Sequence, residues 1–409
     1  MQSRRNFIGN MATGLAGTLA APNVLGANNR VRFGVIGAGA RGTELLREAL
    51  ACPNTECTGV ADIYSRRLEE SRAIAPTARP HLDYRRLLED PAVDAVLIAT
   101  PQHLHAEHFI AALDAGKHVY IEKTMAFTLD HARQMRAAVD RSNARSNARA
   151  GSQRSIQIGH QFTSSGHVAD ATRFLQPDLM GKVTFIQARM YRNTPHGKPQ
   201  WARPVYPDMT PENIHWRAFL GDLPERDFDA HRFVNWRYFW DYSGGSVFEN
   251  MSHQLAFWYK TMGLRIPRSV TMTGGIYLWK DVREVPDTMT VAMEHEEEIL
   301  YTWDCGFGNE RLSVTEDVMG TAGTISRTPQ TIRYAPEKKN RPDGNEMAGV
   351  TRTDPKAHMQ NFLDAIRTGR EPNCPFELGY RVSIACRMAV ESYRQQRTVR
   401  WDAAREEIV

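Results

Sequence analysis

A glycine-rich loop directly after a short apolar run constrains the fold of this chain more than any other feature. Residues 31–36 read Val-Arg-Phe-Gly-Val-Ile, and residues 37–42 read Gly-Ala-Gly-Ala-Arg-Gly. The β-branched run predicts a strand, and residues 43–51 predict a helix. A strand, a G-x-G-x-x-G loop and a helix in this order are typical of the dinucleotide-binding unit of a parallel α/β sheet.

The loop, the helix and a later aspartate have separate physical tasks in such a unit. One glycine permits a tight turn, one lets backbone approach the pyrophosphate, and one allows close packing of helix on strand. The helix N-terminus adds free N–H groups and a positive dipole end. Asp62 lies 20 residues beyond Gly42, where it is expected to accept hydrogen bonds from the adenosine ribose and to repel a 2′-phosphate. This arrangement favours NAD over NADP.

Two arginines keep the NADP alternative open. Arg66 and Arg67 follow Asp62 closely and can hold a phosphate group. We therefore predict a nicotinamide dinucleotide, NAD or alternatively NADP. The residues predicted to contact it in this part of the chain are Gly37, Gly39, Ala40, Arg41, Gly42, Asp62 and Arg66.

Strands and helices alternate up to about residue 160. Residues 93–99 form a continuous apolar run, as expected for a strand buried on both faces. The alternation implies a parallel sheet with right-handed crossovers, so we assign residues 30–160 to a Rossmann domain. Residues 142–154, rich in Ser, Asn, Ala and Arg, predict a frayed helix end or a surface insertion. Further strands are predicted at 57–61, 118–121 and 155–159, and helices at 65–75, 106–115 and 129–140.

The second half has a different pattern, in which strands follow one another without long helices between them. These segments are rich in Val, Ile, Thr, Tyr and Trp and show partial alternation. The pattern indicates an α+β layout whose sheet leaves one face available for a partner or ligand. The predicted strands are residues 182–192, 269–279, 288–295 and 298–304, with one or two shorter strands in 324–332.

Two further segments resemble a known family. Residues 97–105, Leu-Ile-Ala-Thr-Pro-Gln-His-Leu-His, and 115–123, Ala-Gly-Lys-His-Val-Tyr-Ile-Glu-Lys, resemble the glucose–fructose oxidoreductase / inositol dehydrogenase (Gfo/Idh/MocA) family. Residues 159–161, 244–253 and 361–401 extend the resemblance over essentially the whole chain after its N-terminus. It implies a Rossmann domain plus an α+β domain with a large, mostly antiparallel open sheet. Residues 161–409 are then the substrate and oligomerisation domain, whose C-terminal helix can pack back on the Rossmann domain.

The resemblance also implies chemistry on a sugar or polyol hydroxyl beside the nicotinamide. Lys123 ends a buried strand at the carboxyl edge of the sheet, where open α/β sheets bind ligands. Its family counterpart accepts the hydroxyl proton or holds the hydroxyl. The family commonly has proline after this lysine, where this chain has Thr124. The peptide bond before this proline is cis in some relatives, so the local backbone of this chain can differ from theirs at Thr124.

Glu249 and His253 are the other predicted catalytic residues. They are four apart on an expected helix over residues 247–262, which places both side chains on one face. In the family the first position is commonly Asp, and the His serves as general acid/base, for which an imidazole is suited near neutral pH. A metal-binding pair is an alternative, but no third ligand is fixed by the sequence. We therefore predict no metal.

Several other residues are candidates through the family loops. His105 and His108 are interpreted as structural rather than as metal ligands. An aromatic and Arg-rich loop at residues 236–242 is suited to stack on a sugar ring, with packing between domains as the alternative. Further candidates for the cofactor are Thr100, Pro101, His103, Glu122 and Lys123, and candidates for the substrate are His160, Gln161, Tyr191 and Arg237.

Composition and charge narrow the classes of partner. The 409 residues carry a formal net charge of +4 with scattered basic residues, so no footprint for nucleic acid is visible. No apolar run reaches the roughly 18–20 residues of a membrane span. None of the five cysteines forms a C-x-x-C pair. Buried thiols are expected, with a bond between Cys52 and Cys57 as the alternative in an exported protein.

The N-terminus predicts export. Residues 3–8, Ser-Arg-Arg-Asn-Phe-Ile, have the twin-arginine form and precede a weakly apolar stretch of small residues. We assign residues 1–27 to a twin-arginine signal peptide, which implies the export machinery as a partner and a periplasmic location. Because free NAD is scarce outside the cytoplasm, the cofactor is expected to be loaded before export and to stay tightly bound.

Three functions remain open at this point. The first is an oxidoreductase that acts on a secondary hydroxyl of a sugar, polyol or glycoside. The second is a redox-neutral, NAD-dependent glycoside hydrolase or lyase, similar to N-acetylgalactosaminidases of this type. The third is a non-catalytic sugar-binding protein, since fold alone does not establish function. The open sheet face predicts a homodimer or homotetramer.

Overall fold

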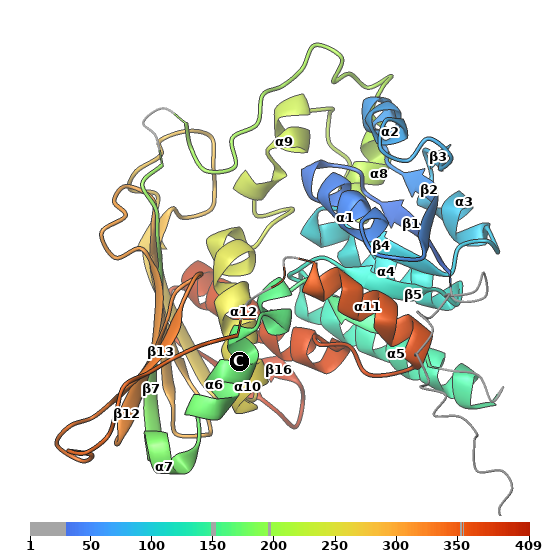
Figure 1. Cartoon of the computed structure of the whole chain (residues 1–409). Coiled ribbons are helices and arrows are strands. Elements are labelled where there is room, and N and C mark those ends of the chain that lie inside the picture. Colours follow the sequence, from blue (N-terminus) through green and yellow to red (C-terminus); the bar gives the residue numbers. More distant parts are fainter. Residues whose placement is uncertain (1–29, 149–152, 195–197, 352–353, 355) are drawn as a thin grey trace, which may run out of the picture.

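The computed structural model describes residues 30–148, 153–194, 198–351, 354 and 356–409, and the predicted signal segment 1–27 lies outside them. The described chain is built on two sheets, with helices packed between them (Figure 1). The predicted fold class, a Rossmann domain with a second, mostly antiparallel sheet, is confirmed. In the part of the chain that the structure describes, we find no helix long and apolar enough to cross a membrane.

The first sheet is parallel and has the strand order β3-β2-β1-β4-β5-β6. Its central strands β4 and β5 are fully buried and mostly apolar, because helices cover both faces. β1 and β5 have the predicted bounds, whereas β3 is too short and polar to be recognised. The strands are β1 (Val31–Ile36), β2 (Thr55–Ala61), β3 (Arg79–His81), β4 (Ala95–Ile98), β5 (His118–Ile121) and β6 (Ile156–Ile158).

The helices of this domain follow the strands that precede them. α1 begins at Ala40, directly after Gly39, three residues earlier than the predicted start at residue 43. α5 continues to Ala148, so residues 142–148 belong to a regular helix and not to a frayed end or an insertion. The helices are α1 (Ala40–Leu50), α2 (Ser65–Arg72), α3 (Tyr84–Glu89), α4 (His105–Asp114) and α5 (Leu129–Ala148).

The second sheet has the order β14-β13-β12-β11-β7-β10-β9-β8-β15-β16 among the described residues. Its pairs are antiparallel except for β7 with β10. The predicted strands are present, but β11, β14, β15 and β16 were not predicted. The bounds are β7 (Val183–Tyr191), β8 (Ser269–Gly275), β9 (Thr288–Glu294), β10 (Leu300–Gly306), β11 (Val314–Gly320), β12 (Gly323–Arg327), β13 (Ile332–Pro336), β14 (Met347–Ala348), β15 (Val399–Asp402) and β16 (Glu407–Ile408).

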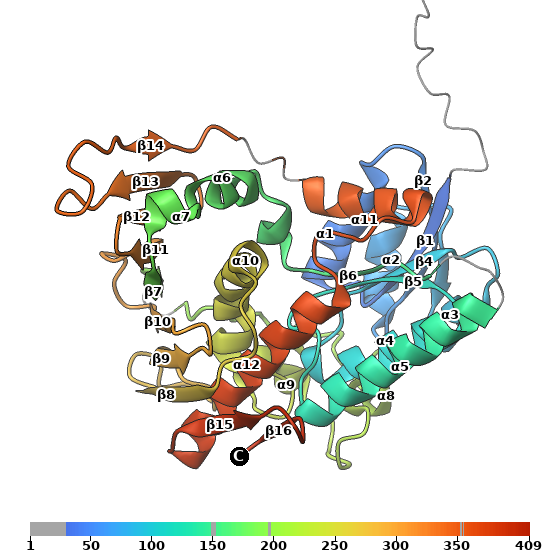
Figure 2. The same ribbon diagram turned by 90° about the horizontal axis from the view of Figure 1, so that it is seen from below.

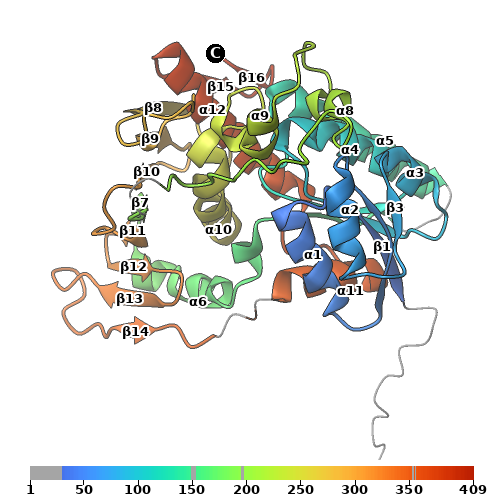
Figure 3. The same cartoon turned by 90° about the horizontal axis from the view of Figure 1, so that it is seen from above.

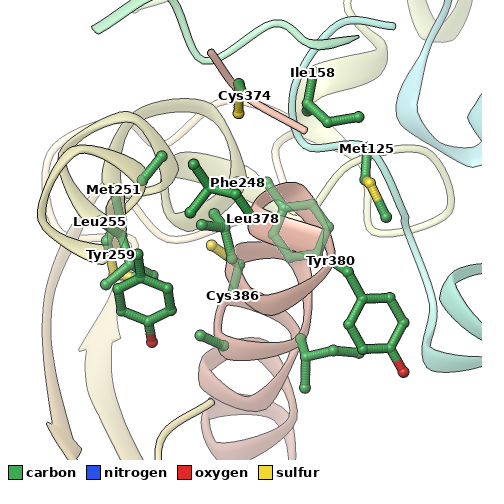
Figure 4. Close-up of a cluster of buried hydrophobic side chains, with 14 of the residues drawn as sticks. Met125, Ile158, Phe248, Met251, Leu255, Tyr259, Cys374, Leu378, Tyr380 and Cys386 are labelled. Carbon is green, nitrogen blue, oxygen red and sulfur yellow. The ribbon is translucent and has the colours of Figure 1, made fainter. Parts of the chain in front are cut away.

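Helices α6 (His167–Phe174), α7 (Pro177–Met180), α10 (Ser252–Met262) and α12 (Phe376–Gln395) lie on the inner side of this sheet (Figures 1 and 2). α12 also contacts the Rossmann domain: a methyl group at Gly379 would meet Ile158 at 2.5 Å and Met125 at 3.1 Å. Figure 4 shows this buried cluster around α12, in which Phe248 and Leu378 lie between the two domains. The domains therefore share one apolar core.

Helix α11 (Ala357–Thr368) packs on the Rossmann domain rather than on the second sheet (Figure 2). Its Met359, Phe362 and Leu363 join a buried cluster with Phe33 of β1 and Leu45 of α1. The chain thus returns to its first domain before α12 crosses back.

A long segment between β7 and the π-helical turn Val247–Met251 also leaves the second domain and lies over the first. We call residues 201–242 the covering segment. It contains α8 (Trp216–Leu220), α9 (Ala230–Val234) and the 3-10 turn Trp236–Tyr238. Figure 3 shows α8 next to α4 of the Rossmann domain, and α9 between α8 and α12. The segment has its own apolar cluster, which Tyr64 joins from the Rossmann domain.

The cysteines are buried and unpaired, and each of the five lies in the described residues. Burial raises the pKa of the Cys57 thiol to about 12. The prediction of buried thiols is confirmed, and the alternative bond between Cys52 and Cys57 is absent from this part of the chain.

Candidate active site

The glycine-rich loop joins β1 to α1 at the carboxyl edge of the parallel sheet. Gly37 has φ +89°, and a methyl group there would also meet Thr100 at 2.8 Å. At Gly42 a methyl group would lie 1.8 Å from the carbonyl oxygen of Gly37, so α1 packs directly on the loop. At Gly39 the nearest atoms are 3.7 Å away, on the Arg67 side chain. The tight turn, the close packing and the open approach are thus assigned to Gly37, Gly42 and Gly39.

Asp62 ends β2 beside this loop and is held by backbone. Its Oδ2 accepts from the N–H of Ala38 at 2.7 Å, and its Oδ1 accepts from the N–H of Tyr64 at 2.9 Å. The carboxylate is buried, and it lines a cavity in front of the loop. Each oxygen retains a lone pair, which fits the predicted bond to a ribose hydroxyl.

Arg67, not Arg66, is the arginine that faces this cavity. Arg66 turns outward, where it pairs with Glu70 at 2.9 Å and with Asp208 at 3.1 Å. Arg67 lines the cavity, with Nη1 3.7 Å from Asp62 Oδ2. The prediction of Arg66 as a cofactor contact is therefore wrong in its placement, because the covering segment captures that side chain.

The cavity has a volume of about 860 Å³ and takes its walls from both domains. Gly37, Gly39, Ala40 and Arg41 line it on one side, together with Thr100 and Pro101. The covering segment supplies the opposite wall. Lys123, Gln161, Arg237, Glu249 and His253 also line this cavity, so predicted cofactor residues and predicted catalytic residues share one space.

Glu122 connects the glycine-rich loop to Lys123. Arg41 Nε donates to Glu122 Oε1 at 2.7 Å, and Glu122 Oε2 accepts from the backbone N–H of Lys123 at 3.1 Å. Gln161 Nε2 also donates to Glu122 Oε1, at 3.3 Å. Arg41 further pairs with Glu44 and Glu48, each at 3.0 Å. Charge-assisted bonds of this kind fix the geometry of the loop relative to the lysine.

Lys123 is held by Glu249, which comes from the other domain. Lys123 Nζ lies 2.9 Å from Glu249 Oε2 and 3.1 Å from the Glu249 carbonyl oxygen. Arg237 Nε is 3.1 Å from the same carboxylate, and Gln102 Nε2 donates to Oε1 at 2.7 Å. Burial raises the pKa of Glu249, but the charges of Arg237 and Lys123 outweigh it and lower that pKa to about 2. Glu249 is therefore an anion that holds Lys123, not a group that exchanges a proton near neutral pH.

His253 lines the cavity one turn beyond Glu249. The first turn of the predicted helix is π-helical, Val247–Met251, and α10 follows it. Burial, with the charge of Lys123, lowers the pKa of His253 well below its usual value, so the imidazole is neutral. Its Nδ1 is buried and has no hydrogen-bond partner among the described residues. A neutral imidazole with an unpaired nitrogen is suited to accept a proton.

His160 stands behind His253 and does not line the cavity that the described residues form. The two rings are perpendicular, with centroids 5.8 Å apart. Both His160 ring nitrogens are buried and unpartnered among the described residues. Direct substrate contact, as predicted for His160, is not supported, because the His253 side chain and the surrounding core exclude it; Gln161 lies in the cavity instead.

Two further predicted contacts lie elsewhere. His103 Nε2 bonds to the Phe219 carbonyl oxygen at 2.7 Å, and its ring packs on Phe219 and Tyr242. It faces the covering segment and is absent from the cavity wall formed by the described residues. Tyr191 lies on β7 against Gly306, also outside this wall. The covering segment explains the position of His103, because it supplies the partners of that ring.

The other loop residues divide into structural and lining positions. His105 bonds to the carbonyl oxygens of Thr100 at 2.9 Å and Thr124 at 3.0 Å, as befits a structural histidine. His108, predicted to be structural, bonds to Thr100 Oγ1 at 3.0 Å and also lines the cavity. The peptide bond between Lys123 and Thr124 is cis, although residue 124 is not proline.

Sequence reasoning missed Gln102, Trp201 and Trp236. Gln102 Oε1 accepts from the N–H of Gly244, so this side chain joins the two domains beside Glu249. The sequence signal for Gln102 was its position between Pro101 and His103, which were both predicted to contact the cofactor. Trp201 and Trp236 line the cavity from the covering segment, and the aromatic loop was the signal for Trp236.

Comparison with known proteins agrees with this geometry. Residues 31–148 match the model of the GFO_IDH_MocA family, described as an oxidoreductase family with an NAD-binding Rossmann fold. The match lies in the N-terminal domain and covers under a third of the chain. The N-terminal domain therefore resembles the NAD-binding fold that the glycine-rich loop predicted.

Curated relatives match over part of their length. Levoglucosan dehydrogenase of Pseudarthrobacter phenanthrenivorans is 48% identical over 155 residues, which are 37% of this chain and 35% of that protein. Myo-inositol 2-dehydrogenase of Thermotoga maritima is 33% identical over 99 residues, 24% of this chain and 30% of that protein. A 1-carboxy-3-chloro-3,4-dihydroxycyclohexa-1,5-diene dehydrogenase of Comamonas testosteroni is 30% identical over 161 residues, 39% of this chain and 38% of the relative. The chain thus spans well under two thirds of the length of these relatives.

Solved structures show that the fold extends over the whole described chain. A levoglucosan dehydrogenase in complex with NADH and levoglucosan matches with a TM-score of 0.69 at 18% identity, over 91% of this chain and 99% of that one. An NAD-binding protein from Listeria innocua matches with a TM-score of 0.66 at 22% identity, over 91% and 97% of the two chains. The second domain therefore has the same fold as in these proteins.

Proposed function

We propose that this chain is an NAD-dependent oxidoreductase that acts on a secondary hydroxyl of a sugar, polyol or glycoside. The observation that carries the proposal is a single cavity that holds both the glycine-rich loop and the cluster of Lys123, Glu249 and His253. The relatives named for levoglucosan and myo-inositol support a polyhydroxylated substrate. Asp62, fixed at the end of β2, supports NAD rather than NADP.

The side chains suggest a division of work. Lys123 Nζ has three N–H groups. Two of them donate to the carboxylate and the backbone carbonyl oxygen of Glu249. The third is available to donate to the substrate hydroxyl oxygen. His253, which lines the same cavity, accepts the hydroxyl proton as the O–H bond breaks. The bound dinucleotide supplies the acceptor for the hydride that leaves the same carbon. The products are a ketone, a protonated His253 and the reduced dinucleotide.

Glu249 and Arg237 position the lysine. A charged amine is costly to bury alone, and the carboxylate of Glu249 compensates for it. Arg237 pairs with the same carboxylate, so one anion holds two cations at the wall of the cavity. Trp201 and Trp236 add aromatic faces on which a sugar ring can stack.

A redox-neutral glycoside hydrolase is the second candidate, and the tightly bound dinucleotide that export implies favours it. In that reaction a hydroxyl is oxidised, the aglycone is eliminated, water adds, and the hydride returns to the ketone. The net reaction is hydrolysis by one water, with no net change in the dinucleotide. The same residues serve both reactions, and release of an aglycone separates them.

Export and assembly are part of the proposal. The twin-arginine pattern of residues 1–27 supports loading of NAD before export to the periplasm through the twin-arginine machinery. The outer face of the second sheet, whose exposed positions include Thr271, Thr273 and Thr290, supports association into a dimer or tetramer.

The test compares Lys123→Ala and His253→Ala with the unaltered chain. Each variant is loaded with NAD and assayed for reduced nicotinamide against a panel of sugars and polyols, while fluorescence measures NADH binding. We expect turnover to fall about 100- to 10,000-fold with dinucleotide binding retained. Lys182→Ala, an exposed lysine paired with Glu298, is the control and should leave turnover unchanged. Undiminished turnover in both active-site variants would overturn the assignment.

A further inference from the structure

The covering segment crosses the carboxyl edge of the Rossmann sheet from one neighbour of β1 to the other. β2 and β4 flank β1, and the glycine-rich loop follows β1. The segment is attached to the residues after β2 and to the residues after β4. Because ligands of open α/β sheets bind at this edge, a chain fixed on both sides spans the dinucleotide groove.

The first attachment is at the start of α2. The backbone of Ser65 donates to the Asn213 carbonyl oxygen at 3.1 Å, and His215 N–H donates to the Ile63 carbonyl oxygen at 2.9 Å. Asp208 accepts from the Tyr64 hydroxyl at 2.6 Å and from Arg66 at 3.1 Å. Four directional bonds therefore hold the segment at the end of β2.

An aromatic contact reinforces this attachment. The ring of Phe233 packs edge-on against Tyr64, with centroids 5.9 Å apart. The Arg67 guanidinium lies over the same Phe233 ring at 4.9 Å. Arg67 is thus held between the segment and Asp62, inside the cavity.

The second attachment is at the 3-10 turn Gln102–Leu104 that follows β4. His103 Nε2 bonds to the Phe219 carbonyl oxygen at 2.7 Å, and the two rings pack edge to face. Gly221 has φ +59°, and a methyl group there would meet Leu104 at 2.6 Å. The segment therefore touches this turn without a gap.

Between the two attachments the segment lines the cavity. His215, Arg217, Phe219 and Phe233 face the space that Gly37, Gly39 and Asp62 line from the other side. The wall opposite the glycine-rich loop is thus made by the second half of the chain. A dinucleotide on the loop would lie between two walls that are bonded to each other at both ends.

We propose that the covering segment is part of the dinucleotide site and keeps the dinucleotide bound from one turnover to the next. The inference rests on the proposed function, because it takes the ligand to be NAD. Opening of either attachment would then speed the release of a bound dinucleotide.

Opening one attachment tests this proposal. Asp208→Ala removes the bonds to Tyr64 and Arg66, and Arg66→Ala removes one of them from the other side. Each holoprotein is loaded with NADH, freed of unbound NADH, and mixed with excess NAD while NADH fluorescence reports release. We expect release about tenfold faster in Asp208→Ala and a smaller increase in Arg66→Ala, because charge-assisted bonds are lost. The full chain should retain NADH through gel filtration.

The control is a similar aspartate away from the cavity. Asp114 is half-exposed at the end of α4 and pairs with Arg145 at 2.9 Å, so Asp114→Ala should release NADH as the unaltered chain does. The melting temperature without dinucleotide is measured for all variants. Similar melting temperatures show that faster NADH release comes from the lost attachment and not from general destabilisation. Equal release rates in Asp208→Ala and the unaltered chain would overturn the proposal. The release assay contains no sugar substrate, so it does not depend on catalysis. A chain that binds NADH but oxidises no sugar would contradict the proposed function and would leave the proposal on the covering segment standing.

Discussion

At the scale of single residues, the carboxylate of Glu249 organises the site. Lys123 and Arg237 both approach its Oε2, at 2.9 and 3.1 Å, and Gln102 donates to Oε1. The sequence predicted Lys123 and Glu249 as catalytic but assigned them no mutual contact. Their pairing joins two domains, and spacing along the chain carries no information about it. Arg66 and Arg67 show the same limit, since only the folded covering segment decides which of them faces outward.

The depressed pKa of Glu249 predicts a pH-dependent part of the stability. The pKa of this carboxyl falls from 4.5 to about 2 on folding, so its stabilisation is present above pH 4.5 and is lost as the pH falls toward 2. Between pH 6 and pH 3 this group should account for a loss of about 2 kcal/mol in the free energy of unfolding.

Urea unfolding of the unaltered chain and of Glu249→Gln between pH 3 and pH 6 measures this contribution. The variant should be less stable at pH 6, and its stability should fall less steeply toward pH 3. Glu69→Gln, an exposed carboxylate on α2 that pairs with Arg72, is the control and should follow the unaltered chain. Parallel pH dependences for Glu249→Gln and the unaltered chain would contradict the assignment.

At the scale of elements, the Rossmann half was the more predictable. β1 and β5 were predicted with their observed bounds, because buried parallel strands are continuous apolar runs. β11 was missed: its sequence, Val-Thr-Glu-Asp-Val-Met-Gly, places two acidic residues in the middle of a strand. Glu316 is buried there because Arg327 of β12 pairs with it. A tertiary ion pair therefore decides this strand, and no local pattern reveals it.

The glycine-rich loop allows a prediction with its own control. Gly42→Ala would place a methyl group 1.8 Å from the Gly37 carbonyl oxygen, a backbone atom, so α1 must shift. We expect a loss of about 3 kcal/mol in stability, together with weaker NADH binding.

Gly39→Ala is the matched variant. Its methyl group meets nothing nearer than 3.7 Å, so the stability of the unliganded protein should stay unchanged. The new methyl group lies on the cavity wall, where it should weaken NADH binding. Thermal unfolding and fluorescence titration of both variants check these outcomes. Equal losses of stability in the two would show that the loop does not pack as described.

At the scale of the whole molecule, the two domains are interleaved. α11 returns to the Rossmann domain, α12 joins both domains, and the covering segment closes the cavity from the second half of the chain. Sequence reasoning described residues 236–242 as a loop suited to stack on a sugar or to pack between the domains. It did not predict that residues 201–242 would bridge β2 and β4, because this course depends on contacts far apart in the chain.

The account stands on one claim, that the cavity holds NAD and passes hydride to it with the help of Lys123. The most direct measurement mixes the NAD-loaded chain, freed of unbound dinucleotide, with sugars, polyols and aryl glycosides, and follows the absorption band of reduced nicotinamide. We expect a substrate-dependent rise that does not exceed the amount of protein and that is lost in Lys123→Ala. A chain that takes up no dinucleotide, or a rise that persists undiminished in Lys123→Ala, would contradict the account.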